Sequence, residues 1–169
     1  MALYKNGTFI EDRWRALPDG EAAPVSGHVI FPFDWWMEER HAFDGSNVPL
    51  GVRIEPGTRL DAIAEDIKRF SVIALSFPKY GDGRAFSLAR LLRDRHGFTG
   101  EIRAVGEVLS DQIQLMQRSG FDAFEITDAV TEQALQEGRV PGVSHFYQPG
   151  LGAEAPVGTR PWTRQSTGG

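Results

Sequence analysis

The chain contains no cysteine. This absence excludes disulfides, thiolate nucleophiles, Cys-ligated iron–sulfur clusters and CxxC redox chemistry, so any redox role needs an organic cofactor or a partner protein. Long apolar runs are also missing, since no window approaches the roughly 18 to 20 apolar residues of a membrane span. The first stretch, MALYKNGTFIEDRW, lacks the basic-then-apolar pattern of a signal peptide. We therefore expect a cytoplasmic protein with no membrane partner.

Nucleotide-binding fingerprints are absent or incomplete. No GxxxxGK[ST] phosphate loop occurs, and GDGRAF begins like a dinucleotide fingerprint but places Phe86 where the third glycine is needed. A standard Rossmann site is not expected, and the cofactor stays unassigned. The net charge of −5 and pI near 5.4 give no footprint for nucleic acid. The four histidines are dispersed, so no metal site is predicted, and no GxSxG nucleophile elbow occurs.

The 169 residues suffice for one domain, and a 41% apolar content with eleven Phe supports a substantial core. We predict a single α/β domain over residues 1–148. Within it, residues 1–46 form a hairpin and a short helix, and residues 47–148 form a βα core. Residues 149–169 are rich in Pro, Gly and Ala and are predicted to be a flexible tail.

Local patterns place the elements of this domain. Asn6-Gly7 between β-favouring stretches predicts a hairpin, and a short strand then leads through Asp34 as N-cap into a helix ending near Asp44-Gly45. The βα core begins at Leu50. Its expected strands are GVRIEP, SVIALSF, EIRAVG and FEIT, and its expected helices are TRLDAIAEDIKRF, DGRAFSLARLLRDRHG, LSDQIQLMQRSG and TDAVTEQALQEG.

Four βα units in series predict a parallel sheet, either flavodoxin-like or half-barrel-like, with the hairpin added. VIALSF is apolar throughout, as in a central strand, whereas VRIE and AFEI alternate as edge strands do. A sequential strand order leaves one sheet face without helices. The hairpin and the Trp-bearing helix would cover that face, or two chains would close half-barrels against each other, and we expect a homodimer.

Ligands of parallel α/β sheets bind outside the carboxyl ends of the strands. Polar loop residues are expected at this edge: Glu55, Lys79, Asp82, Arg84, Glu107, Asp111 and Asp128. The loop FPKYGDGRAF, residues 77–86, is the best candidate. Its catalytic candidates are Lys79, Asp82 and Arg84, with the two cations as anion ligands and Asp82 as a general base or as the group that orients a cation.

Glycines 81 and 83 of the same loop let backbone N–H groups approach a ligand. The structural alternative is that Asp82 is only the N-cap of the following helix and that both cations are solvated. Arg103, between apolar residues of a predicted strand, needs a partner, and Glu55 or Glu125 is expected to supply it. The predicted ligand-binding residues are Gly81, Gly83, Glu55, Arg103, Glu107 and Asp111.

The segment from Asn47 to Ile126 resembles a bacterial family, domain of unknown function 934, which is commonly labelled a probable oxidoreductase involved in sulfite reduction. The resemblance is carried by PLGVRIEP and by IALSFPKYGDGRAFSLARLLRDRHGFTGEIRAVGEVLSDQIQLMQRSGFDAFEI, and more loosely by the hairpin and HFYQP. The family motif FPKxxDGR falls on Phe77, Pro78, Lys79, Asp82, Gly83 and Arg84, and a second motif falls on Arg103 to Glu107. Relatives often carry Cys where Ser119 stands, so this chain does not require a thiol there.

The resemblance implies a protein of assimilatory sulfite or sulfate reduction. Together with the loop residues, it leads us to expect an oxidoreductase or accessory protein that binds a small anion at the strand ends. One alternative is a non-catalytic protein that docks on sulfite reductase or another sulfur-assimilation enzyme through an aromatic surface around Trp35 and Trp36. Another is a flavin- or nicotinamide-dependent reductase, which has the weakest support from the residues.

Overall fold

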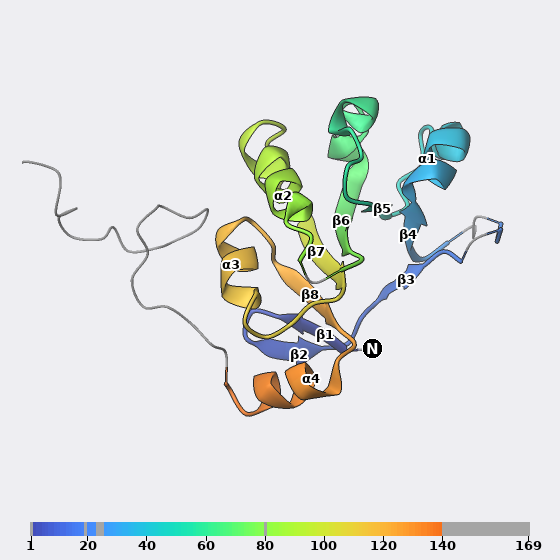
Figure 1. Ribbon diagram of the computed structural model, residues 1–169. Coiled ribbons are helices and arrows are strands. Elements are labelled where there is room, and N and C mark those ends of the chain that lie inside the picture. Colours follow the sequence, from blue (N-terminus) through green and yellow to red (C-terminus); the bar gives the residue numbers. More distant parts are fainter. Residues whose placement is uncertain (1, 19, 23–25, 80, 140–169) are drawn as a thin grey trace, which may run out of the picture.

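The computed structural model describes residues 2–18, 20–22, 26–79 and 81–139. It contains one sheet of eight strands in the order β2-β1-β8-β7-β6-β5-β4-β3 (Figure 1). The strands are β1 (Ala2–Lys5), β2 (Thr8–Ile10), β3 (Trp14–Ala16), β4 (His28–Pro32), β5 (Leu50–Ile54), β6 (Phe70–Phe77), β7 (Glu101–Gly106) and β8 (Ala123–Ile126). The helices are α1 (Phe33–Glu39), α2 (Arg84–Asp94), α3 (Ile113–Arg118) and α4 (Ala129–Gln136), with 3-10 turns η1 (Arg40–Phe43), η2 (Leu60–Ile63) and η3 (Ile67–Arg69).

Strands β3 to β8 run parallel in sequential order, and the β1–β2 hairpin joins β8 antiparallel. The α/β class and the hairpin at Asn6-Gly7 are confirmed, since both turn residues have the positive φ of a tight hairpin turn. The sheet is a curled half-barrel and not a flavodoxin-like sheet. Six strands are parallel where four were predicted, because β3 and β4 from the first 46 residues extend the βα core.

The curl follows from one short connection. Strands β2 and β3 lie at opposite edges of the sheet, yet only residues 11–13 join them. In a flat sheet, eight strands about 4.8 Å apart would hold the two edges about 34 Å from each other. The chain from Ile10 to Trp14 spans at most about 14 Å. The edges therefore approach each other, and the sheet encloses an inner face.

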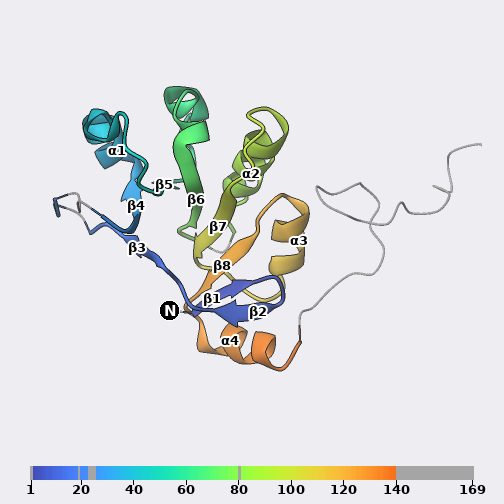
Figure 2. The same cartoon turned by 180° about the vertical axis from the view of Figure 1, so that it is seen from behind.

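The outer face carries the helices, as the two opposite views show (Figures 1 and 2). The larger core lies between these helices and the sheet, and includes Val52, Ile73, Leu75, Ile102 and Phe124 from the strands. A smaller apolar cluster of Ile30, Val72, Ala74 and Val105 fills part of the inner face, with Trp14 packed against it. The helix α1 lies outside with the others, so it does not cover the inner face.

The segment expected as a helix over residues 58–70 forms two 3-10 turns instead. Leu60, Ile63 and Asp66 are buried at a spacing of three, whereas Ala64, which an α-helical stripe would bury, is exposed. A spacing of three suits the 3-10 geometry. Asp66 turns inward because Trp36 Nε1, Arg40 and Arg69 each donate to its carboxylate at 3.1 Å.

Two other local predictions are wrong. Pro32 is the N-cap of α1, and Asp34 lies inside its first turn. Strands β5 and β8 are not edges, because β4 and β1 pair with their outer sides. Their alternation has another cause, namely that the inner face of the curled sheet is polar at Arg53 and Glu125 while the outer face is apolar.

The two αβ junctions at Gly97-Phe98 and Gly120-Phe121 have the same local structure. Both glycines have positive φ, and the following Phe N–H groups donate back to Leu92 and Met116 at 2.9 and 3.1 Å. Both phenylalanines are buried. None of the helices in the described part of the chain has the length and apolar content to cross a membrane.

Candidate functional site

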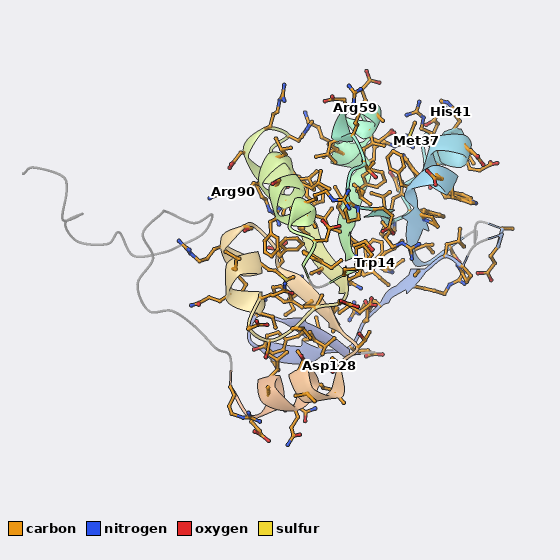
Figure 3. All side chains as sticks on the ribbon, viewed as in Figure 1. Trp14, Met37, His41, Arg59, Arg90 and Asp128 are labelled. Atoms are coloured by element: carbon orange, nitrogen blue, oxygen red, sulfur yellow. The ribbon has the colours of Figure 1, made fainter. Side chains whose placement is uncertain are left out.

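The carboxyl ends of four neighbouring strands gather the polar loop residues. Glu55 follows β5, Lys79 follows β6, Glu107 follows β7 and Asp128 follows β8. Because these strands are parallel, the four residues lie at one edge of the sheet. Asp128 is the N-cap of α4, and its side chain accepts a hydrogen bond of 2.7 Å from Thr131 N (Figure 3).

Asp82 and Arg84 form a fixed pair at the start of α2. Arg84 Nε and Nη2 donate to the two carboxylate oxygens of Asp82 at 2.9 and 2.6 Å, and Arg84 N donates at 3.2 Å. The hydrogen bonds from Arg84 lower the pKa of Asp82 to about 2. The N-cap of α2 is Gly83, with no side-chain cap. Asp82 therefore holds the guanidinium, and its low pKa makes it a poor general base near neutral pH.

The remaining nitrogen of Arg84 points across to the next loop. A Cβ added to Gly57, in the loop after β5, would lie 3.3 Å from Arg84 Nη1. The Arg84 side chain is nonetheless 64% exposed, so the guanidinium borders the loop and faces solvent. Lys79 is exposed, and within the described residues it forms no ion pair. We call Gly57, Lys79, Asp82 and Arg84 the rim.

The other predicted loop residues have separate surroundings. A Cβ on Gly81 or Gly83 would meet no atom within 4 Å, so both glycines border open space. Glu55 pairs with Arg53 Nε at 3.3 Å on the surface. Glu107 N donates to Phe77 O at 2.8 Å, which joins the end of β7 to that of β6. The side chains of Glu107 and Asp111 are exposed, and both residues have interaction partners.

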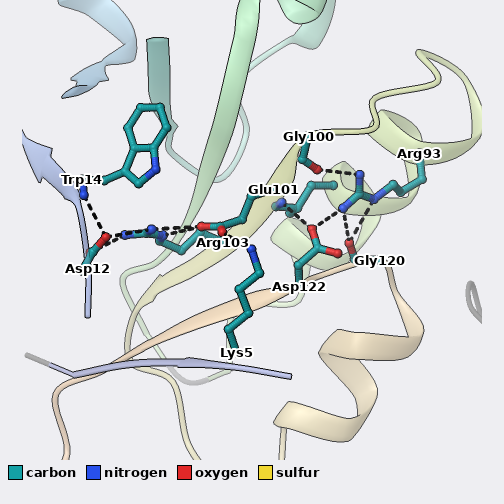
Figure 4. A network of polar contacts seen from close by, with 10 residues as sticks. Lys5, Asp12, Trp14, Arg93, Gly100, Glu101, Arg103, Gly120 and Asp122 are labelled. Carbon is teal, nitrogen blue, oxygen red and sulfur yellow. Dashed lines mark hydrogen bonds and ion pairs between the residues drawn. The ribbon is translucent and has the colours of Figure 1, made fainter. Parts of the chain in front are cut away.

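Arg103 lies on the inner face, away from the rim. It is 1% exposed, and it contacts Asp12 at 2.6 and 3.1 Å and Glu101 at 2.9 and 3.0 Å (Figure 4). Burial opposes its charge, but these carboxylates raise its pKa above the ordinary value. The expected partners, Glu55 and Glu125, are wrong. Asp12 was not predictable as a partner, because only the curl brings residues 11–13 over β7.

Glu125 is the inward residue of β8 near its carboxyl end. It is half-buried, and among the described residues its carboxylate has no hydrogen bond or ion pair. Burial raises its pKa, outweighing the opposite effects of Arg103 and Arg53, while Asp12 adds to the rise. Sequence reasoning missed Lys5, Asp12 and Arg53 as inner-face residues. The sequence did contain a signal for Arg53, because the strands VRIE and AFEI both place a charged residue on the face opposite their apolar residues.

The aromatic surface proposed for docking is largely core. Trp36 is 0% exposed and packs on Phe31, Phe43 and Phe70, while Trp35 is half-buried and stacks on Phe31. These aromatic residues pack in the core on the outer face, so the prediction that the Trp-bearing helix covers the face without helices is wrong. The docking alternative loses the surface on which it was based.

No His, Asp and Glu group within the described residues has the arrangement of a metal site. Glu101 and Asp12 approach each other only through Arg103, which separates them as their shared cation. The chemistry available at the carboxyl edge is therefore that of guanidinium, ammonium, carboxylate and backbone groups.

Comparison with known proteins identifies the family. No curated protein matches the chain. The model of a family described as "Bacterial protein of unknown function (DUF934)" matches residues 51–158, well over half of the chain. The matched region includes the rim, Arg53, Arg103 and Glu125, and it begins after β4. The chain thus belongs to the DUF934 family of bacterial proteins of unknown function.

Proposed function

We propose that the chain binds a small oxyanion at the rim, between the loop after β5 and the first turn of α2. The observation that carries the proposal is the geometry of Arg84. Asp82 fixes two of its nitrogens, and Nη1 lies against the backbone at Gly57. A guanidinium held in this way is pre-organised for an anion, because little conformational freedom is lost on binding.

The surroundings of Arg84 are consistent with an anionic ligand. The first turn of α2 contains no acidic residue and begins with a cation, where the helix dipole favours negative charge. Lys79 adds a second exposed cation on the preceding loop. The open space beside Gly81 and Gly83 leaves room for the ligand to approach.

The class of anion comes from the family resemblance. The label of sulfite reduction favours sulfite or sulfate, and it favours a role as oxidoreductase or accessory protein beside a sulfite-reducing enzyme. Asp82 acts in this proposal as the residue that positions Arg84. Because its pKa is about 2, anion binding at the rim is expected to be independent of Asp82 titration between about pH 5 and 8.

Calorimetric titration with sulfite, sulfate and phosphate tests this function. The double variant Lys79→Ala, Arg84→Ala is expected to lose binding by tenfold or more, about 1.4 kcal/mol, with little change in melting temperature. Arg90→Ala is the matched control, because Arg90 is an exposed arginine further along the same helix (Figure 3). Unchanged affinity in the double variant, or equal loss in the control, would contradict the proposal.

A further inference from the structure

The inner face of the sheet carries its side chains in layers. The ladder registers align Arg53, Ala74, Arg103, Ala123 and Lys5 across five strands. Two residues further toward the carboxyl ends of the parallel strands, the inward positions are Ser76, Val105 and Glu125, with Leu3 opposite Glu125. The cations Arg53, Arg103 and Lys5 are thus separated by Ala74 and Ala123. Glu125 lies one layer nearer the carboxyl-end opening of the curled sheet, which we call the mouth.

In the layer that contains Arg53, Arg103 and Lys5, the charges of Arg103 and Lys5 are already paired. Arg103 donates to Asp12 and Glu101, and Lys5 Nζ lies 2.6 Å from Glu101 (Figure 4). Arg53 differs, because among the described residues it forms one ion pair, in which Nε lies 3.3 Å from the exposed Glu55, and such a surface pair is weak. Within the described residues, the terminal nitrogens of Arg53 donate no hydrogen bond.

Glu125 differs for the complementary reason. Its carboxylate is half-buried and has no hydrogen bond or ion pair with another described residue. The other inward residues of the same layer on the neighbouring strands are Val105, which is apolar, and Ser76, which has only a hydroxyl group. Withdrawing a carboxylate from water without a partner is unfavourable, so the protonated form gains. A carboxylic acid O–H is a strong donor to an anionic oxygen.

We propose that this mouth is a second binding site, in which a small monoanion lies between the guanidinium of Arg53 and the protonated carboxyl of Glu125. Arg53 supplies the opposite charge, and the Glu125 O–H donates to the second oxygen of the ligand. One proton is taken up from solvent when the complex forms from ionised Glu125. The site is independent of the rim, which uses Lys79 and Arg84.

The charged groups facing Glu125 set the direction of the pH effect. Arg103 and Arg53 favour its ionised form, while burial and Asp12 favour the protonated form and prevail. Since the bound state requires the proton, affinity falls as the pH rises above the pKa of Glu125. The Asp12 and Glu101 carboxylates form ion pairs with Arg103 and Lys5.

The test is a titration of the full chain with acetate, followed by the amide resonances of β5 and β8 at pH 5.5 and 7.5. We expect dissociation constants about fivefold or more weaker at pH 7.5, with the largest shifts at Arg53 and Glu125. In Glu125→Gln, whose amide still donates, binding persists and the pH dependence disappears. Arg53→Gln loses binding at both pH values, and Arg53→Lys keeps part of it.

Arg90→Gln is the matched control, because Arg90 is an exposed arginine of α2 outside both proposed sites, and it is expected to leave acetate binding and its pH dependence unchanged. The proposal is overturned if wild type does not bind acetate, if the pH dependence survives in Glu125→Gln, or if Arg90→Gln weakens acetate binding as much as Arg53→Gln does. Folding is checked in the same spectra. Glu125→Gln is expected to fold at least as stably at neutral pH, because it removes a half-buried ionisable carboxyl.

Discussion

Gly106, at the end of β7, shows how one residue joins two strand ends. Its φ of 97° belongs to the left-handed side, and a Cβ there would lie 2.5 Å from Phe77 O and 3.0 Å from Phe77 C. Both atoms belong to the backbone of β6, so displacing either of them costs considerable free energy. The close approach also lets Glu107 N donate to Phe77 O at the point where β6 leads into the rim.

Gly106→Ala is therefore expected to reduce the free energy of unfolding by about 3 kcal/mol, through strain and backbone overlap together. Gly97→Ala is the matched control, because Gly97 also has positive φ but no atom within 4 Å of its added Cβ. The free energy of unfolding of that control should fall by about 1 kcal/mol. Urea denaturation measures both, and equal losses would show that the Phe77 contact contributes nothing.

At the scale of elements, Arg93 connects the end of α2 to the beginning of two strands. Its guanidinium donates to Phe98 O and Gly100 O at 2.6 and 2.8 Å, to Gly120 O at 3.0 and 3.1 Å, and to Asp122. Asp122 in turn accepts from Ile102 N at 2.8 Å (Figure 4). This network lies at the amino ends of the strands, opposite the rim, so it holds the sheet without touching either proposed site.

Arg93→Met keeps the apolar stem but removes the guanidinium that donates to these carbonyls and to Asp122, and we expect it to lose about 3 kcal/mol of stability. Arg93→Lys should recover only a part, because an ammonium cannot reproduce the planar fork. Denaturant unfolding gives the magnitudes, and faster hydrogen exchange of the Ile102 amide locates the change. A loss below about 1 kcal/mol in Arg93→Met would mean that the network is replaceable by water.

At the scale of the whole molecule, residues 11–13 connect the two edges of the sheet across its inner face. Asp12 contacts the buried Arg103, and Trp14 covers Gly51, where a Cβ would lie 3.1 Å from the Trp14 ring. The curl thereby explains how an arginine is 1% exposed inside a sheet whose helices all lie on the other face. The monomer fills part of its own inner face, and the predicted homodimer stays a prediction.

Asp12→Asn should destabilise the chain by about 3 kcal/mol, because it leaves the Arg103 cation buried with only Glu101 beside it. The amides of β3 should also exchange faster, since the edge strand is then held less firmly. Asp61→Asn is a suitable control, because Asp61 is an exposed acid that lies 3.6 Å from Arg59. If Asp12→Asn matched this control in stability and exchange, the ion pair would have no part in the closure.

Local physical chemistry made much of the fold predictable. Apolar VIALSF became the well-buried β6, Asn6-Gly7 became a hairpin turn, and the glycines after α2 and α3 ended those helices. The sequence also determined that positive charge and glycine follow β6 at the carboxyl edge. These features depend on nearest neighbours along the chain, so one sequence is sufficient to recognise them.

The tertiary structure alone decided which charges meet. The sequence indicated Asp82 as a general base or as the group that orients a cation, and in the structure Arg84 donates to both of its carboxylate oxygens. Asp12 and Arg103 are 91 positions apart and meet because the sheet curls. Arg53 and Glu125 alternate like edge-strand residues and yet face an enclosed interior. Sequence periodicity gives the face of a strand, whereas the environment of that face depends on how the whole sheet closes.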